Sequence, residues 1–147
     1  MANIYVIGAC ALIATTNNEK RAESIYKIYT KIHQSKYSHE IEQYSLRIHY
    51  INLLEYYYIF LKAKGKQYAN EKLHKIKQSN ITIATTFNEE IFHLVGRIKA
   101  TYHDLSLADA FALAETIISN GTLITFDKGF KLAEKAKEAK FFNHIPN

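Results

Sequence analysis

Short runs of β-branched and apolar residues alternate with longer helical segments along this chain, and this alternation restricts the fold more than any other feature. Four such runs are expected as strands, at residues 4–7, 44–51, 80–86 and 122–126. The only proline is Pro146, so the helices between the strands can run long. Strands that alternate with helices predict an α/β fold with a mostly parallel central sheet.

The helical segments are recognised by apolar residues at helical spacing, such as Ala22, Ile25, Ile28 and Ile32. A polar stretch at residues 34–40 is expected as a loop, and residues 140–145 as a short last strand. The helices are predicted from residue 11 with a break near residues 17–18, then over 19–34, 52–65, 66–78, 88–102, 107–119 and 128–139.

The length and composition predict one domain over residues 1–147. With 48% hydrophobic residues, a chain of 147 residues can bury a core without disulfides. The single cysteine, Cys10, excludes a disulfide within the chain. We find no signal-peptide pattern and no apolar stretch of about 20 residues, the length that a membrane span needs. We therefore expect a soluble protein of the cytoplasm with no membrane partner.

The charge is compatible with nucleic-acid binding, although a lysine-rich solvated surface explains it equally well. Nineteen Lys and Arg residues against fourteen Asp and Glu residues give a net charge of +5 and a pI near 9.2. The run Tyr56–Tyr58 has two readings as well: base stacking, or packing within an amphipathic helix, which we favour.

Three acids, Glu55, Asp109 and Asp127, are expected at the carboxyl ends of the strands, where such sheets bind ligands. From Asp109 a helix of about 11 residues leads roughly 16 Å away, at ~1.5 Å per residue. The strand at residues 122–126 then returns about 16 Å, at ~3.3 Å per residue. Asp127 therefore ends level with Asp109. Glu55 reaches the same edge from the first turn of the helix that follows residues 44–51.

Each acid also has a purely structural explanation, because Asn52–Glu55 and Ser106–Asp109 have the spacing of capping boxes. Asp127 is likewise suited to cap the helix that follows it. Their convergence favours a function, because two carboxylates ~5 Å apart at an effective dielectric constant near 20 repel by about 3 kcal/mol. Mg²⁺ or Mn²⁺ would remove this cost and enable hydrolysis of a phosphodiester.

Three stretches resemble the motifs of PIN-domain ribonucleases, in particular VapC-type toxins of toxin–antitoxin pairs. They are "YVIGACALIA", "INLLEYYYIF" and "LSLADAFALAETIISNGTLITFDKGF", and the last is the most specific. The resemblance covers nearly the whole chain. It implies a three-layer α/β/α fold, RNA as the substrate, Mg²⁺ or Mn²⁺ as the cofactor, a homodimer, and a VapB-type antitoxin that fills the acidic groove.

The family's first motif ends its strand with an aspartate, and this chain has Gly8 there. The resemblance implies that Gly8, Glu55, Asp109 and Asp127 occupy the catalytic positions. Position 8, Asp109 and Asp127 would be the metal ligands. We therefore expect weak metal binding and little or no RNA cleavage. The structural alternative is a turn that needs a glycine with positive φ.

Smaller expectations concern residues beside the acids. Asn52 and Thr125 are candidates to position water or substrate, with capping and strand packing as the alternatives. Asp104 is ranked as a spare ligand only. Cys10 is expected behind the first strand, where a nucleophile has no histidine to activate it. The histidines lack zinc-ligand spacing and are expected on the surface or as satisfied polar groups.

The leading hypothesis is therefore a metal-dependent ribonuclease toxin that Gly8 has inactivated or weakened. The alternative is a non-catalytic PIN-like module that holds RNA or a protein, and the activity of a Gly8→Asp form would discriminate the two. A phospho-receiver domain is disfavoured, because neither the strand at residues 80–86 nor the first strand ends in an aspartate.

Overall fold

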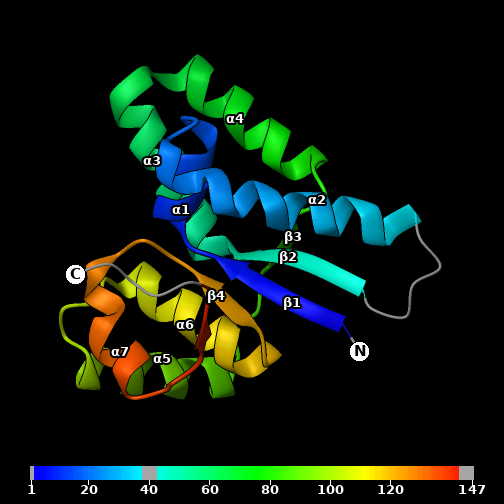
Figure 1. The fold of residues 1–147 in the computed structure, drawn as a ribbon. Helices are drawn as coiled ribbons and strands as arrows, with labels where there is room; N and C mark the ends of the chain where they lie inside the picture. The colour runs from blue at the N-terminus through cyan, green and yellow to red at the C-terminus, as the bar shows by residue number, and fades with distance from the viewer. Residues whose placement is uncertain (1, 38–42, 143–147) are drawn as a thin grey trace.

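The computed structural model describes residues 2–37 and 43–142, and five strands form a central sheet with helices on both faces (Figure 1). The strands are β1 (Ala2–Ile7), β2 (Gln43–His49), β3 (Thr82–Ala84), β4 (Thr122–Ile124) and β5 (Lys140–Phe141). The helices are α1 (Ala9–Thr16), α2 (Glu23–Tyr37), α3 (Tyr50–Lys64), α4 (Lys66–Gln78), α5 (Glu89–Thr101), α6 (Leu107–Ser119) and α7 (Lys131–Lys135), with short 3-10 helices η1 (Lys20–Ala22) and η2 (Lys128–Phe130).

The sheet has the order β3-β2-β1-β4-β5, and every pairing is parallel. The predicted three-layer α/β/α fold is thus confirmed. Because every pair is parallel, all the strands run the same way and their carboxyl ends share one edge; β1 and β2 run toward the left of Figure 1. Because β1 lies at the centre of the sheet, the residues that follow it stand in the middle of this edge.

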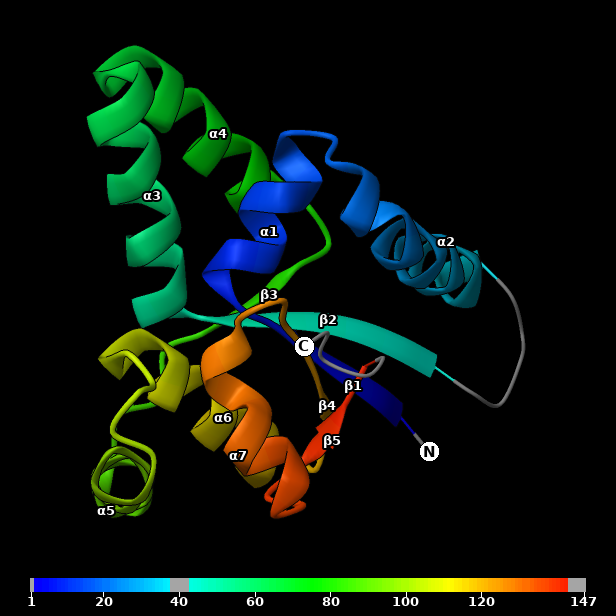
Figure 2. The same ribbon diagram turned by 60° about the vertical axis from the view of Figure 1, so that its left-hand side comes forward.

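Two hydrophobic clusters separate the layers. One cluster joins the sheet to α1, α2, α3 and α4, and the other joins it to α5, α6 and α7 (Figure 2). Adjacent residues of β1 face opposite sides, with Val6 in the second cluster and Ile7 in the first. Both residues are fully buried, which explains why the carboxyl-terminal end of this strand is apolar.

The turn between α6 and β4 forms as predicted. Asn120 ends the helix in the left-handed conformation, with φ 53°. Gly121 follows, and a side chain there would place its Cβ 2.8 Å from the carbonyl oxygen of Ile4. The close approach of β1 to this turn therefore requires a glycine.

Several predicted boundaries differ from the structure. The first helix begins at Ala9 rather than at residue 11, and α2 continues through part of the predicted loop to Tyr37. The strand expected at residues 122–126 ends at Ile124, and the helix expected at 128–139 is the η2–α7 pair, which ends at Lys135. Residues 38–40 of the predicted loop and 143–145 of the predicted last strand lie outside the described residues.

Within residues 2–37 and 43–142, no helix combines the length and the apolar character that a membrane span requires.

Candidate metal and nuclease site

Asp109 lies at the start of α6, in a position that the helix terminus fixes. Ser106 caps the helix, and its hydroxyl accepts a hydrogen bond from the backbone N–H of Asp109 at 3.1 Å. The side chain of Asp109 is buried, although no cation neutralises it in the described residues. The predicted capping at Ser106 is confirmed, but capping does not explain why the acid itself is buried.

Asp127 follows the end of β4 and is held by two backbone hydrogen bonds. Its own N–H donates to the hydroxyl of Thr125 at 3.1 Å. Its Oδ1 accepts from the N–H of Gly129 at 2.8 Å and so caps η2. The capping role that we considered for Asp127 is therefore confirmed. This cap uses only Oδ1, so Oδ2 of Asp127 takes no part in it.

The carboxyl groups of Asp109 and Asp127 meet at this edge of the sheet. Burial, a hydrogen bond with Asp127 and the negative charge of Asp127 together raise the pKa of Asp109 to about 7. The nearby charge of Glu55 acts in the same direction. Groups whose pKa is shifted by burial together with a specific charged neighbour are common at functional sites.

Glu55 reaches the same group of acids from α3. Its side chain is half-buried, and its pKa is raised first by this burial and then by the charge of Asp127. The three acids that the sequence indicated are thus within electrostatic reach of one another. The capping prediction for this helix is wrong, however, because α3 begins at Tyr50 and its cap is His49, whose Nδ1 accepts from the N–H of Ile51.

Gly8 ends β1 beside these acids. Its N–H donates to the carbonyl oxygen of Ile124 at 3.1 Å, and its φ and ψ are −81° and 165°. This extended conformation suits any residue, so the structural alternative of a turn with positive φ is wrong. The nearest atom to a Cβ at position 8 would be the Ile124 oxygen at 3.8 Å, an ordinary contact. Neither backbone conformation nor space thus requires a glycine here.

The remaining predicted residues have different surroundings. Asn52 is 0% exposed, and neither polar atom of its amide has a hydrogen-bond partner in the described part of the chain. Thr125 is buried, and its hydroxyl accepts a hydrogen bond from the backbone N–H of Asp127 in the turn after β4. Asp104 is exposed and pairs with His103 rather than with the acids. The spare-ligand role of Asp104 therefore has no support in this geometry.

Cys10 belongs to the site, which the sequence did not reveal. Its Sγ lies 3.8 Å from Oγ1 of Thr125. Burial raises the pKa of the Cys10 thiol, and the charges of Asp109 and Asp127 add to the increase. The thiol is thus kept protonated and is a poor nucleophile. The one signal for its position was that it follows the end of β1 by three residues.

The residues at this edge can be compared with the ligands that a metal ion requires. Carboxylate oxygens of Asp109, Asp127 and Glu55 match the preference of Mg²⁺ and Mn²⁺, so the residues fit such a cation in chemical kind. In the described segments, however, no three His, Cys, Asp or Glu side chains are grouped so that they could hold a metal. An aspartate at position 8 would add a carboxylate at this edge.

A family model described as "PIN domain" matches residues 5–136 of the chain. No curated protein matches it in sequence.

Several solved structures share the fold. For VapBC2 from Rickettsia felis, solved with a DNA fragment from its promoter, the identity is 18% and the TM-score 0.69, with 96% of this chain and 98% of that chain covered. For VapBC-1 from nontypeable Haemophilus influenzae the identity is 14% and the TM-score 0.64, with 95% of this chain and 97% of that chain covered. For FitAcB from Neisseria gonorrhoeae the identity is 14% and the TM-score 0.63, with 95% of this chain and 96% of that chain covered.

Proposed function

Because the chain belongs to the PIN-domain family, we propose that it is a VapC-type toxin whose metal-dependent ribonuclease site lacks one acid. The observation that supports this proposal is the contact between the buried carboxyl group of Asp109 and the partly exposed carboxyl group of Asp127, with Glu55 nearby. The likeness of the fold to VapBC structures supports the toxin assignment.

In the proposed mechanism, Asp109 and Asp127 would hold Mg²⁺ or Mn²⁺, and an aspartate at position 8 would complete the ligand set. When bound, the cation would supply positive charge to activate water and to stabilise the charge on the phosphodiester. Glu55 would accept the proton of the attacking water. Burial and the charge of Asp127 raise its pKa, which is the direction of shift that suits a general base. Asp127 is kept in place by Thr125 and Gly129.

Gly8 makes this chain a weak enzyme in our proposal. A missing ligand lowers metal affinity and leaves the charges of Asp109 and Asp127 uncompensated, so RNA cleavage is slow or absent. A site of this kind can still bind RNA through the basic surface, which is the non-catalytic alternative. The lack of a three-residue metal group among the described residues is the observation that favours this alternative.

Cleavage of RNA by a Gly8→Asp variant tests the proposal. We expect the variant to cleave a mixed RNA substrate in the presence of Mg²⁺, and we expect EDTA to abolish this cleavage. The Gly8→Asn variant, of the same size but uncharged, and the Gly8→Asp/Asp109→Asn double variant stay inactive. If Gly8→Asp is folded and bound to metal but leaves RNA intact, the nuclease proposal is wrong and the non-catalytic alternative stands.

We also propose a homodimer, which rests on the resemblance to VapC toxins. Large apolar side chains are exposed near one another at the ends of α3 and α5. Tyr50 and Phe87 are 51% and 65% exposed, and they are neighbours in space because His49, next to Tyr50, bonds through Nε2–H to the carbonyl oxygen of Thr86. A second copy of the chain would cover this surface.

A VapB-type antitoxin is the second proposed partner, because the structural neighbours are VapBC assemblies. A mainly apolar hollow of about 440 Å³ lies between α1, α2 and the end of α4, with Leu12, Tyr29 and Ile76 among its lining residues. An apolar segment of the antitoxin would suit this hollow, while a basic residue would suit the acids.

A further inference from the structure

The three arginines of the chain have different partners, and this difference singles out Arg21. Arg47 donates from Nη1 to the buried carboxylate of Glu115 at 3.0 Å. Arg97 donates to Glu138 from both of its terminal nitrogens. Arg21 instead contacts Glu19 through Nε at 3.2 Å, and in the described part of the chain its two terminal nitrogens have no partner.

The guanidinium group of Arg21 also contacts the residue that precedes Asp127. Its Cζ lies 5.1 Å from the centroid of the Phe126 ring, a cation–π contact between η1 and the end of β4. Phe126 stands between Thr125 and Asp127, and its backbone bonds to Cys10, so the ring belongs to the same edge of the sheet. Arg21 is therefore fixed at the rim of the site by a ring on one side and a carboxylate on the other.

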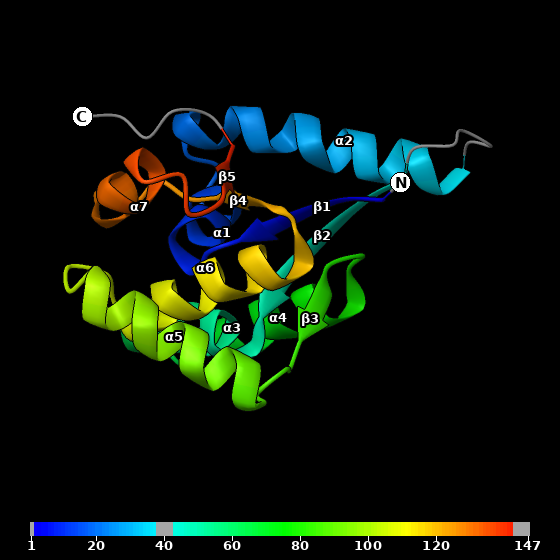
Figure 3. The same ribbon diagram turned by 90° about the horizontal axis from the view of Figure 1, so that it is seen from below.

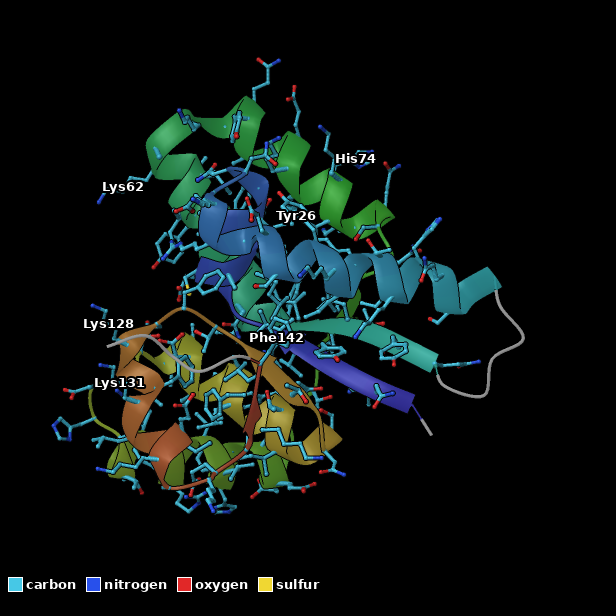
Figure 4. The ribbon with its side chains drawn as sticks, in the orientation of Figure 1. Tyr26, Lys62, His74, Lys128, Lys131 and Phe142 are labelled. Carbon is cyan, nitrogen blue, oxygen red and sulfur yellow. The ribbon has the colours of Figure 1, made fainter. Side chains whose placement is uncertain are left out.

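A rim cation is needed if RNA is to approach the acids. The cluster of Asp109, Asp127 and Glu55 repels a polyanion, and this repulsion must be offset close to the reacting phosphate. Lys128, the residue after Asp127, is exposed, and Figure 4 shows its side chain on the side toward which the strands run. Lys128 follows Asp127 in the chain, and Arg21 contacts Phe126, the residue that precedes Asp127.

We propose that Arg21 binds a phosphate of the RNA strand that flanks the scissile one. The inference rests on the proposed function. A guanidinium group whose Nε is already held offers two parallel N–H donors, which match two phosphate oxygens. Its side chain is 53% exposed, so a phosphate can reach it. In this arrangement the contact with Phe126 fixes the direction from which the RNA strand approaches the site, past η1 toward Asp127.

Binding of a labelled single-stranded RNA, measured by fluorescence anisotropy at several KCl concentrations, tests this inference. The unsubstituted chain, with Gly8, can be used for this measurement, because we expect it to bind RNA without cutting it. Arg21→Ala should weaken binding about tenfold and make the slope of log K against log[KCl] shallower by about 0.7, the share of one phosphate contact. Arg21→Lys should keep the slope and lose part of the affinity.

Lys62→Ala is the matched control, because Lys62 is exposed at the far end of α3 (Figure 4). It should leave both slope and affinity unchanged. If Arg21→Ala binds RNA with the slope of the natural chain, the inference is overturned while the proposed function stands. If neither the natural chain nor Gly8→Asp binds RNA, the proposed function fails, and the inference with it.

Discussion

Asp109 and Asp127 are eighteen positions apart in the sequence, yet their carboxyl groups share a hydrogen bond at the carboxyl edge of the sheet. The helix α6 leads away from Asp109 and β4 returns to Asp127, as Figure 3 shows from below. The intervening turn at Asn120 and Gly121 sets the return, so the contact between the two acids is a consequence of local structure as well as of the overall fold.

The first prediction concerns the pH dependence of stability. The pKa of Asp109 rises from 3.8 to about 7 on folding, mainly through burial. Between these values the folded protein binds a proton more tightly than the unfolded chain, so stability is highest at low pH and falls as the pH rises through 7. Relative to Asp109→Asn, we expect the free energy of unfolding to fall by roughly 1–4 kcal/mol between pH 5 and 8.

Urea denaturation of both proteins at several pH values measures this difference. The variant removes the contribution of Asp109 together with its interaction with Asp127 and Glu55, while titrating groups elsewhere in the chain cancel. If the free energy of unfolding varied with pH in the same way for both proteins, the pKa of Asp109 would not be raised by its surroundings.

The second prediction concerns the ion pair that joins β2 to α6. Glu115 is 2% exposed, and Arg47 is its partner. Arg47→Met leaves a buried carboxylate without a cation and should lower the free energy of unfolding by about 3 kcal/mol. Replacing both residues, as Arg47→Met/Glu115→Leu, should recover most of the loss.

Arg97→Met is the control for this pair, because its contact with Glu138 is more exposed and should contribute less than about 1 kcal/mol. Chemical denaturation at pH 7 compares the variants. An equal loss for Arg47→Met and Arg97→Met would contradict the importance given to burial.

The third prediction concerns the amide of Asn52, which is buried without a hydrogen-bond partner in the described residues. Asn52→Leu removes an unsatisfied polar group at similar volume and should raise the free energy of unfolding by about 1 kcal/mol. In a Gly8→Asp background the same change should lower RNA cleavage. A less stable Asn52→Leu protein would show that the amide has a structural partner instead.

The sequence predicted most of the fold because its strands and helices have distinct patterns. The helix at residues 107–119 was predicted with its observed bounds, since Ser106 and Asn120 mark its two ends. The meeting of Asp109 and Asp127 followed from the lengths of the predicted helix and strand between them, and the approach of Glu55 followed from its place near the start of a helix that leaves the same edge.

Other features depended on contacts that no spacing reveals. His49 caps α3 because its ring is held between the N–H of Ile51 and the carbonyl oxygen of Thr86. The strand β4 ends early because the hydroxyl of Thr125 turns the chain at Asp127. Of the three tyrosines in a row, Tyr56 is buried as expected, whereas Tyr58 is 51% exposed.

Calorimetric titration of Mn²⁺ into the natural chain and into Gly8→Asp tests the central claim most directly. We expect Gly8→Asp to bind one ion at least tenfold more tightly than the natural chain, and Gly8→Asn to resemble the natural chain. Position 8 has space for the new side chain, so a folded variant is expected. Equal affinity of the natural chain and Gly8→Asp for Mn²⁺ would contradict the claim that position 8 is the missing metal ligand.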